Sequence, residues 1–384
     1  MHYAPKEHNL EILARFETSF WQNVPEGSFI VGLSSISWRE AWKYGERAFR
    51  YVNLDAGHAW QSIVVSAKML GWKTTRLDST SNADIHKLIG LNQKSRFHEE
   101  EHADMLLLIS PEMLLPSQNL DTLVESIPLF FHGIANQLSP SVYPWEIIES
   151  IEKATSVDEK AQAKVLTLPT KRVASKESKE VVLQRRSVHV MDKESSTIST
   201  AEFYTLLRSV QNSLDSKENA THLAIFVNRV EGLKQGLYIL VRNLKAKEKL
   251  QKAMSNNFLW KEQKLSSLYL LHEHDYTLFS KTVSCGQDIA SDGAFSLGML
   301  AQYSQELVSF GGHRYKELYW ECGAIGQQLY LEATSLGLSG TGIGCFLDDM
   351  MHETLGLQDN QFQILYHFTV GRGYVDSRIK TISV

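Results

Sequence analysis

The sequence predicts an α+β fold, and patterns of two kinds lead to this class. Short apolar runs of strand length stand at 102–109, 223–230 and 236–241. A long helix is predicted at 315–336, where apolar side chains recur at helical spacing over a broad face. Because strands are interspersed with long buried helices, an α+β class is favoured over an all-α class.

Length and composition describe an ordinary globular chain with room for two domains. The chain has 384 residues, of which 43% are hydrophobic and 22% are charged, and this length fits about two domains of the usual size. The formal net charge is −5. An acidic balance argues against nucleic acid as the main partner.

The cysteines and the apolar runs indicate the cellular compartment of the protein. Cys285, Cys322 and Cys345 are odd in number and show neither a CxxC motif nor a spacing with histidine that suits zinc. This pattern fits a reducing compartment, and no metal site is predicted. The first residues lack the apolar core of a signal peptide, and the strongest apolar run, at 105–115, is interrupted by Pro111. We therefore expect a cytoplasmic protein with no membrane partner.

The chain opens with a predicted amphipathic helix over 8–24. Leu10, Leu13, Phe16 and Phe20 recur there at the spacing of one helical face.

A stretch near the N-terminus recurs 266 residues later without a gap. Residues 50–91 lie over 316–357, and nine of the 42 pairs are identical, where roughly three would be expected by chance. Glycines coincide at four positions, counting the pair Gly45 and Gly311 just outside the stretch. A shared helix pattern could produce such a match, but the coincident glycines and the absence of gaps favour a duplication.

The repeat and the composition between its copies suggest how the chain is divided. The run at 102–109 has its counterpart at 362–370. Residues 152–182 are rich in Lys, Glu, Ser and Ala, which is typical of a linker or a loosely docked helix. We expect a first domain at 1–155, a linker at 156–180 and a second domain at 181–384.

The second domain begins with local signals of its own. Ser199 is the expected N-cap of a helix over 198–207, with Glu202 at the capping-box position. The runs at 223–230 and 236–241 are expected to pair, with Gly232 in the connection between them. Residues 294–308 predict either a helix or a strand followed by a helix.

The long helix is expected to be a packing element that leads into a glycine loop. Gly323 and Gly326 each cost about 1 kcal/mol of helix propensity, so we interpret them as positions where another helix or a flat ligand approaches the backbone. The helix is expected to end after Gly337. The loop at 339–344 would then offer exposed N–H groups to a phosphate or a flat ring.

Three short motifs in the second domain could bind an anion. Arg185, Arg186 and Ser187 together can hold a phosphate through charge-assisted hydrogen bonds, although adjacent arginines are usually just solvated. The glycine loop at 339–344 is the second motif, and an ordinary helix end is its alternative. Gly371-Arg372-Gly373 is the third, and a turn after a strand is its alternative. Their joint order in one domain strengthens the anion-binding interpretation.

That joint order resembles the nitroreductase-like flavoprotein superfamily, and more closely its SagB-type dehydrogenases, the oxidases of thiazole and oxazole peptides. The segment at 44–58, Y-G-E-R-A-F-R-Y-V-N-L-D-A-G-H, is similar to a pattern of that family, and 323–331 with 342–344 is similar to a second one. The resemblance covers most of 30–110 and 181–373. It implies tandem nitroreductase-like domains, each an antiparallel sheet flanked by helices, that form a pseudo-dimer within one chain.

The resemblance also implies FMN as the cofactor, and comparison of the two copies predicts at most one site per chain, on the second copy. The first copy has Lys73-Thr74-Thr75-Arg76 where the second has Ser339-Gly340-Thr341-Gly342, so it is expected to be a degenerate scaffold that closes the pocket. No catalytic residue is nominated. The expected cofactor-binding residues are Arg185, Arg186, Ser187, Gln327, Gly340, Thr341, Gly342, Ile343, Gly344, Arg372, Asn136 and Ser139.

The expected function is that of an FMN-dependent oxidoreductase acting on a small molecule or on azolines in a modified peptide. Two alternatives stay open at this point. One is an NAD(P)H-dependent nitro or quinone reductase, and the other is a catalytically silent scaffold or binding protein. The pseudo-dimer could also assemble into a further homo-oligomer.

Overall fold

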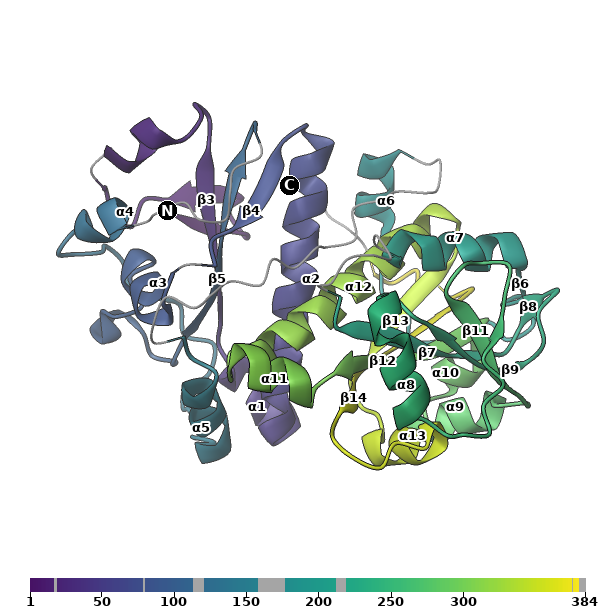
Figure 1. Cartoon of the computed structure of the whole chain (residues 1–384). Coiled ribbons are helices and arrows are strands. Elements are labelled where there is room, and N and C mark those ends of the chain that lie inside the picture. Colours follow the sequence, from purple (N-terminus) through teal and green to yellow (C-terminus); the bar gives the residue numbers. More distant parts are fainter. Residues whose placement is uncertain are drawn as a thin grey trace. The chain divides into compact units, whose positions relative to one another are not determined.

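The computed structural model describes residues 1–16, 19–78, 80–112, 121–157, 177–211, 219–374 and 376–379 (Figure 1). These residues fall into two compact units. The first unit holds those within Met1–Ala56 and Ile63–Val165, and the second holds those within Gly57–Ser62 and Leu166–Ile379. Most of the predicted linker, 158–176, lies outside the described residues, and the domain boundaries therefore stay predictions.

The first unit is built on a three-stranded antiparallel sheet with the order β3-β5-β4. Its central strand, β5, is the predicted strand at 102–109, and every residue after its first is buried. The elements of this unit are β1 His2–Ala4, β2 Asn9–Glu11, η1 Ser19–Asn23, β3 Phe29–Ser35, α1 Trp38–Tyr44, η2 Gly45–Arg47, α2 Ala48–Met69, β4 Lys73–Arg76, α3 Asn82–Leu88, η3 Lys94–Arg96, β5 His102–Ser110, α4 Asp121–Glu125 and α5 Glu146–Ala154.

The predicted opening helix over 8–24 is wrong. The chain begins with a hairpin, in which β1 pairs antiparallel with β2, and the next regular element is the short 3-10 helix η1. His2 and Glu11 are joined across the hairpin by a 2.9 Å contact. Phe20 is buried in the core of this unit and Phe16 packs against that core, so their apolar character reflects burial rather than helical spacing.

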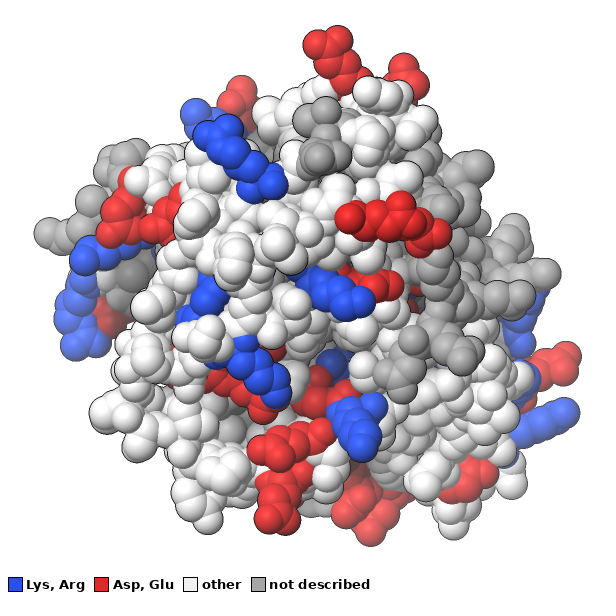
Figure 2. Space-filling view, turned by 90° about the vertical axis from the view of Figure 1, so that its left-hand side faces the viewer, with Lys and Arg blue, Asp and Glu red and all other residues white. Residues whose placement is uncertain are grey.

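Charges of both signs are mixed on the face shown in Figure 2. Lysine and arginine side chains stand among aspartates and glutamates there, and the described residues form no broad patch of one sign on that face. No helix in the described ranges combines the length and the apolar character that crossing a membrane requires.

The second unit is built on a seven-stranded antiparallel sheet with the order β10-β11-β9-β7-β12-β14-β13. A separate pair, β6 and β8, is parallel. The elements are α6 Ser178–Gln184, β6 Ile198–Ser199, α7 Thr200–Val210, β7 Thr221–Val227, β8 Val230–Glu231, β9 Gly236–Leu240, η4 Leu244–Ala246, α8 Lys247–Ala253, β10 Lys261–Glu262, β11 Leu268–Glu273, α9 Thr277–Val283, α10 Asp288–Asp292, β12 Phe295–Gln302, α11 Ser304–Phe310, α12 Arg314–Ser335, β13 Ser339–Ile343, α13 Asp348–Leu355 and β14 Phe362–Gly371.

Most local predictions for this unit are confirmed. Ser199 caps α7, and Glu202 completes the capping box as predicted. Strands β7 and β9 pair antiparallel, and Gly232 in their connection has a φ of 78°. Of the two alternatives at 294–308, the strand followed by a helix is correct.

The central strands are buried on both faces. Ala224 and Phe226 of β7 belong to a core cluster with residues of α8, α9 and α13, whereas Leu223 and Ile225 lie on the opposite face because side chains alternate along a strand. Helices α7 and α12 pack against each other, and α12 also contacts β7, β13 and β14. This sandwich of helices around the sheet fixes α12 beside the strands of the candidate site.

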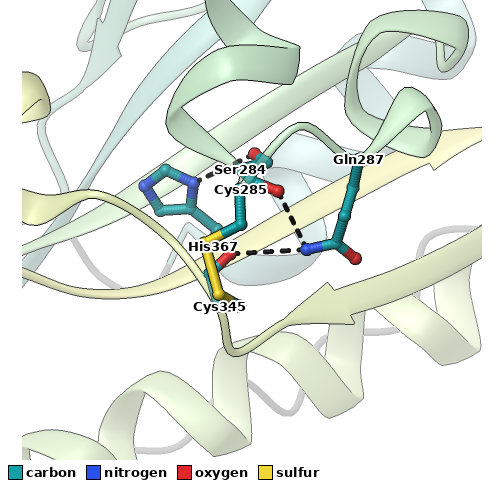
Figure 3. Close-up of a disulfide and its surroundings, with 5 residues drawn as sticks. All are labelled: Ser284, Cys285, Gln287, Cys345 and His367. Carbon is teal, nitrogen blue, oxygen red and sulfur yellow. Dashed lines mark hydrogen bonds between the residues drawn. A yellow bond between two sulfur atoms is a disulfide. The ribbon is translucent and has the colours of Figure 1, made fainter.

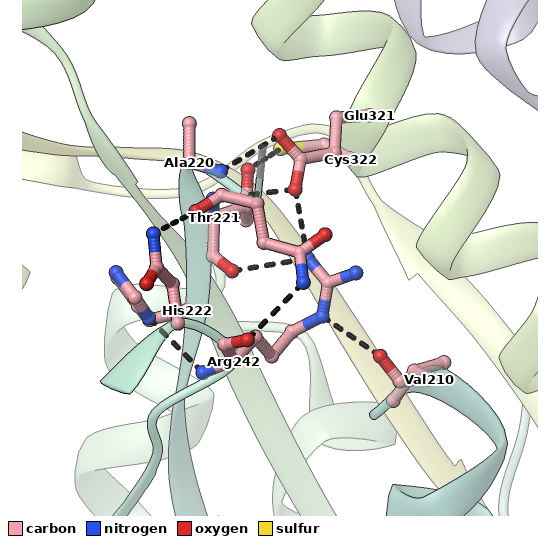
Figure 4. A network of polar contacts seen from close by, with 9 residues as sticks. Val210, Ala220, Thr221, His222, Arg242, Glu321 and Cys322 are labelled. Carbon is pink, nitrogen blue, oxygen red and sulfur yellow. Dashed lines mark hydrogen bonds and ion pairs between the residues drawn. The ribbon is translucent and has the colours of Figure 1, made fainter. Parts of the chain in front are cut away.

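Helix α12 buries 19 of its 22 residues, several of them charged. Buried charges must be paired, and the carboxylate of Glu321 accepts from Arg242 Nη1 at 2.8 Å (Figure 4). The same guanidinium also donates to the carbonyl oxygens of Val210 at 2.8 Å and Thr221 at 3.0 Å. The network therefore ties α12 to β7 and to the end of α7.

The repeated stretch has the same secondary structure in both copies. Helix α2 spans Ala48–Met69 and α12 spans Arg314–Ser335, so both ends differ by the same 266 residues. His86 Nε2 accepts a hydrogen bond from the backbone N–H of Ala103 at 3.1 Å, and His352 Nε2 accepts one from that of Ile364 at 3.1 Å. The two stretches thus share a hydrogen bond between helix and strand as well as their glycines.

Candidate functional site

The predicted glycine loop is a strand, which corrects the sequence interpretation. Ser339–Ile343 form β13, the edge strand of the sheet, which pairs antiparallel with β14. A Cβ at Gly340 would lie 2.8 Å from the ring of Phe368, and a Cβ at Gly342 would collide with the hydroxyl of Tyr366. The glycines are therefore required by close packing on aromatic rings, a cause that the sequence pattern did not reveal.

The Arg-Arg-Ser motif runs along the outer edge of this strand. Ser187 forms a parallel β-bridge with Gly340. Thr341 Oγ1 donates to the carbonyl of Val188 at 2.8 Å and accepts from its N–H at 3.2 Å. Two of the three predicted motifs are therefore in direct backbone contact.

The third motif joins the same segment a few residues later. Met191 forms an antiparallel β-bridge with Gly373, and the N–H of Asp192 donates to the carbonyl of Arg372 at 2.7 Å. The N–H of Arg372 in turn donates to Ser196 Oγ at 3.0 Å. One continuous segment, 187–192, thus contacts the glycine strand at Gly340 and the residues that follow β14 at Gly373.

The three arginines of these motifs have different surroundings. The guanidinium of Arg185 lies 5.1 Å from the centre of the Tyr330 ring. Arg186 Nη1 donates to the carbonyls of Leu183 and Arg185, at the C-terminal end of α6. Arg372 is exposed. Within the described residues, Arg185 and Arg372 have no carboxylate partner, so their charges are available to an anion.

Tyr330 of α12 is a residue of this site that the motif search missed. Its hydroxyl lies 2.8 Å from Ser187 Oγ and accepts from the N–H of Gly342 at 2.8 Å. It therefore links the helix, the glycine strand and the Arg-Arg-Ser motif. Its place in an apolar helical face made it indistinguishable from a core residue in the sequence.

His58 is a second residue that the sequence did not single out, although it ends the Ala-Gly-His part of the family pattern. It belongs to the short stretch of α2 counted with the second unit. Its Nδ1 lies 3.1 Å from Gln327 Oε1 and its Nε2 lies 3.2 Å from the hydroxyl of Tyr366. A Cβ at Gly326 would lie 2.9 Å from the His58 ring, so the interpretation of Gly326 as a close-approach position is confirmed.

Burial keeps the imidazole of His58 neutral at physiological pH. Desolvation lowers its pKa to about 4, the hydrogen bond with Gln327 opposes this shift, and the charge of Arg185 adds to it. A neutral imidazole donates from one ring nitrogen and accepts at the other. His58 can therefore bridge the Gln327 amide and the Tyr366 hydroxyl without bringing a further positive charge to the site.

Four other predicted residues lie in two different places. Ile343 is the last residue of β13 and is buried, and Gly344 follows it directly. Asn136 and Ser139 belong to the first unit, where Arg39 Nη2 donates to Asn136 Oδ1 at 3.2 Å and Ser139 Oγ donates to the carbonyl of Ser141 at 2.9 Å. Their role toward a cofactor stays a prediction.

The Arg185 guanidinium lies over the Tyr330 ring, and the Tyr330 hydroxyl lies beside the hydroxyl of Ser187 at this edge of the sheet. Guanidinium groups and a serine hydroxyl suit phosphate. In the described ranges, no group of three or more His, Cys, Asp or Glu side chains could hold a metal ion.

Part of the second unit matches the model of a known protein family. The Nitroreductase family model matches residues 232–372, which include α12, β13 and most of the sheet. Residues 232–372 are therefore similar to the Nitroreductase family. A comparison with curated proteins found no match.

One solved structure shows the same fold, and two others match part of this chain. A protein from Anabaena variabilis, assigned as a nitroreductase, is 20% identical with a TM-score of 0.63, covering 90% of this chain and 69% of that one. One from Ralstonia eutropha, also assigned as a nitroreductase, is 15% identical with a TM-score of 0.37, covering 56% and 91%. The NADPH:FMN oxidoreductase from Vibrio harveyi, solved with NAD+, is 15% identical with a TM-score of 0.31, covering 53% and 72%. The first of these shows that the chain has a nitroreductase-like α+β fold, as predicted.

Proposed function

We propose that the chain is an FMN-dependent oxidoreductase of the nitroreductase class. One observation carries the proposal: segment 187–192 is joined by backbone contacts to Gly340 on one side and to Gly373 on the other. Motifs that are about 150 or more residues apart in sequence therefore meet at one edge of the sheet. The match of the Nitroreductase family model to 232–372 supports the same class.

The residues of this edge fit the FMN phosphate and ribityl chain. A phosphate carries about two negative charges, and Arg185 and Arg372 have no carboxylate partner within the described residues. Ser187 is exposed and adds a hydroxyl donor. Arg185, Arg186, Ser187 and Arg372 would hold the phosphate end.

The flavin ring would supply the transfer of an electron pair, which is the difficult step of the reaction. The chain's own residues bind and orient it. Gly340 and Gly342 pack one face on Phe368 and Tyr366, and Ser187 forms a bridge at the outer edge of β13, so a ligand would reach this part of the site through the exposed side chain of Ser187. Gln327 and His58 add polar atoms beside the strand.

For the substrate, we propose azoline oxidation in a modified peptide, because the patterns at 44–58 and 323–331 resemble those of the SagB-type dehydrogenases. Reduction of nitro or quinone compounds with NAD(P)H is the other reaction of this class. Turnover assays with NAD(P)H plus a quinone, and with an azoline peptide plus oxygen, separate the two. The growth of an aromatic azole absorbance with the peptide would decide for the first.

We further propose that the two copies of the repeat arose by duplication and together replace a dimer. The matched bounds of α2 and α12 and the shared histidine contacts of His86 and His352 support this origin. A shared helix pattern would not by itself reproduce a hydrogen bond between helix and strand.

Cofactor content tests the proposed function directly. Purified protein, or protein incubated with FMN, is expected to show flavin absorbance, and Arg185→Ala/Arg186→Ala is expected to lose it. Arg208→Ala is a matched control because Arg208 also stacks on a tyrosine, Tyr204, in the same unit. A colourless protein that FMN cannot reconstitute would contradict the proposal.

A second candidate function is a catalytically silent scaffold. It is favoured by the packing of Gly340 and Gly342 on the chain's own rings and by the Arg186 contacts to the carbonyls of Leu183 and Arg185. Protein that binds FMN but turns over neither NAD(P)H nor azoline peptides would decide for this alternative.

A further inference from the structure

A covalent link joins the end of the glycine strand to the end of helix α9. Cys285 and Cys345 form a disulfide across 60 residues of sequence, with their Cα atoms 5.9 Å apart (Figure 3). This Cα distance is one at which the bond forms without a movement of the backbone. Both cysteines are partly exposed, which gives solvent access to the pair.

Hydrogen bonds that do not involve sulfur also join the segments around Cys285 and Cys345. The N–H of Leu347 donates to the carbonyl of Val283 at 2.8 Å. Gln287 Nε2 donates to the carbonyls of Ser284 at 2.9 Å and Cys345 at 3.4 Å. None of these bonds uses a sulfur atom, so we expect the two cysteines to stay near each other when the disulfide is open.

A contact between two aromatic rings also holds the segment after Cys345. Phe346, the residue after Cys345, stacks on His367 of β14 with ring centroids 4.5 Å apart and an interplanar angle of 9°. His367 is itself paired with Ile343 in the sheet. The residues around the disulfide are therefore held by the pairing of β13 with β14, by the ring contact and by hydrogen bonds.

Gly344 is the residue that the disulfide constrains most directly. It lies between Ile343, where β13 ends, and Cys345. Glycine has more backbone freedom than any other residue. A closed disulfide adds a covalent constraint on the far side of Gly344, whereas an open one leaves that side held by the hydrogen bonds and the ring contact alone.

We propose that Cys285 and Cys345 form a reversible redox site that sets how tightly the 340–344 segment binds its ligand. The closed pair holds the segment in its binding conformation, so less ordering is needed on binding. In the reducing compartment that the sequence predicts, disulfides are usually transient and redox-sensing. The effect on ligand binding rests on the proposed FMN site, whereas the redox site itself does not.

The opening step is a thiol–disulfide exchange with a dithiol reductant. A thiolate of the reductant attacks one sulfur of the pair, the bond between Cys285 and Cys345 breaks, and the second reductant thiol then displaces the mixed disulfide. The reductant loses two electrons and becomes a disulfide. The two electrons and two protons end on the cysteines as thiols.

Alkylation of the full-length native protein tests the redox site. After incubation with oxidised glutathione and its removal, N-ethylmaleimide is expected to add to neither Cys285 nor Cys345. After dithiothreitol it is expected to add to both, as mapped by mass spectrometry. Cys322 is an internal control, because it is buried and burial raises the pKa of its thiol. Labelling of the pair before reduction, or none after it, would overturn the site.

The FMN dissociation constant of both redox forms tests the coupling. Reduced protein is expected to bind FMN at least about fivefold more weakly than oxidised protein, as for a typical coupling between sites. Cys285→Ser/Cys345→Ser should show the weaker binding with or without reductant, while Cys322→Ala should keep the redox response. Equal affinities in both forms would overturn the coupling. Failure of both forms to bind FMN would instead overturn the proposed function, and alkylation would still decide the redox site.

Discussion

The hydroxyl of Tyr366 occupies the volume in which a Cβ at Gly342 would stand. This contact explains the glycine on the edge strand without any reference to a ligand. Gly342→Ala must displace the phenol or the strand, and overpacking of this kind costs about 1–3 kcal/mol. We expect the free energy of unfolding, measured with urea, to fall by that amount.

The Tyr366→Phe background is the matched control for this change. It removes the hydroxyl oxygen, which is the atom nearest to the new Cβ. The cost of Gly342→Ala should then be smaller, because contacting residues are not additive. An unchanged cost would show that the hydroxyl is not the cause.

The buried ion pair between Arg242 and Glu321 predicts a large loss of stability on breaking it. Arg242 has no exposed surface, so Glu321→Ala leaves a buried guanidinium without its counter-charge. Removing one partner of such a pair typically costs about 3–5 kcal/mol. We expect a loss of this size in urea unfolding.

A double-mutant cycle separates the pair from the packing around it. Arg242→Met combined with Glu321→Ala should cost less than the sum of the two single changes, because the second change no longer strands a charge. Additive costs would mean that the 2.8 Å contact between the two side chains adds nothing.

The disulfide predicts a stability that depends on redox state. A cross-link that closes a loop of 60 residues is expected to contribute about 4 kcal/mol through the unfolded state. Reduced protein should therefore unfold at a lower temperature in calorimetry. Cys322→Ala should leave the difference between the two forms unchanged, and Cys285→Ser/Cys345→Ser should abolish it.

Buried histidines predict a loss of stability in acid. Burial lowers the pKa of His367 to about 3, and the charge of Asp348 opposes this only partly. In the unfolded state the imidazole has a pKa of about 6.5 and binds the proton first. The contribution of neutral His367 to the free energy of unfolding is therefore fully present above pH 6.5 and is lost as the pH drops towards 3.

His367→Phe isolates this contribution. It keeps an aromatic ring against Phe346 and removes the titrating group. We expect the slope of unfolding free energy against pH to flatten by about 1.4 kcal/mol per pH unit between pH 6.5 and 3, which is one proton. A slope that matches the parent would show that His367 titrates normally.

The sequence predicted those parts of the fold that depend on local signals. The helix expected at 315–336 is Arg314–Ser335, and the cap at Ser199 is where the capping box placed it. Such signals act within a few residues. The helix expected at 8–24 failed because Phe16 packs against the core from outside any helix and Phe20 is buried from the short 3-10 helix η1.

The site was less predictable because its contacts are long-range. Arg185, Ser187 and Arg372 were found from their residue types, but their meeting depends on strand order. Gly342 was interpreted as exposed because Tyr366, its neighbour in space, comes from another strand. The pairing of Cys285 with Cys345 has no local signal at all.

The disulfide also has a topological consequence for the second unit. The chain between Cys285 and Cys345 contains β12, α11, α12 and β13, so in the oxidised protein one covalent ring includes two strands of the seven-stranded sheet and the long buried helix α12. A single cut by a protease anywhere inside this ring would leave the two fragments bonded. They would migrate as one band on a denaturing gel until a reductant released them.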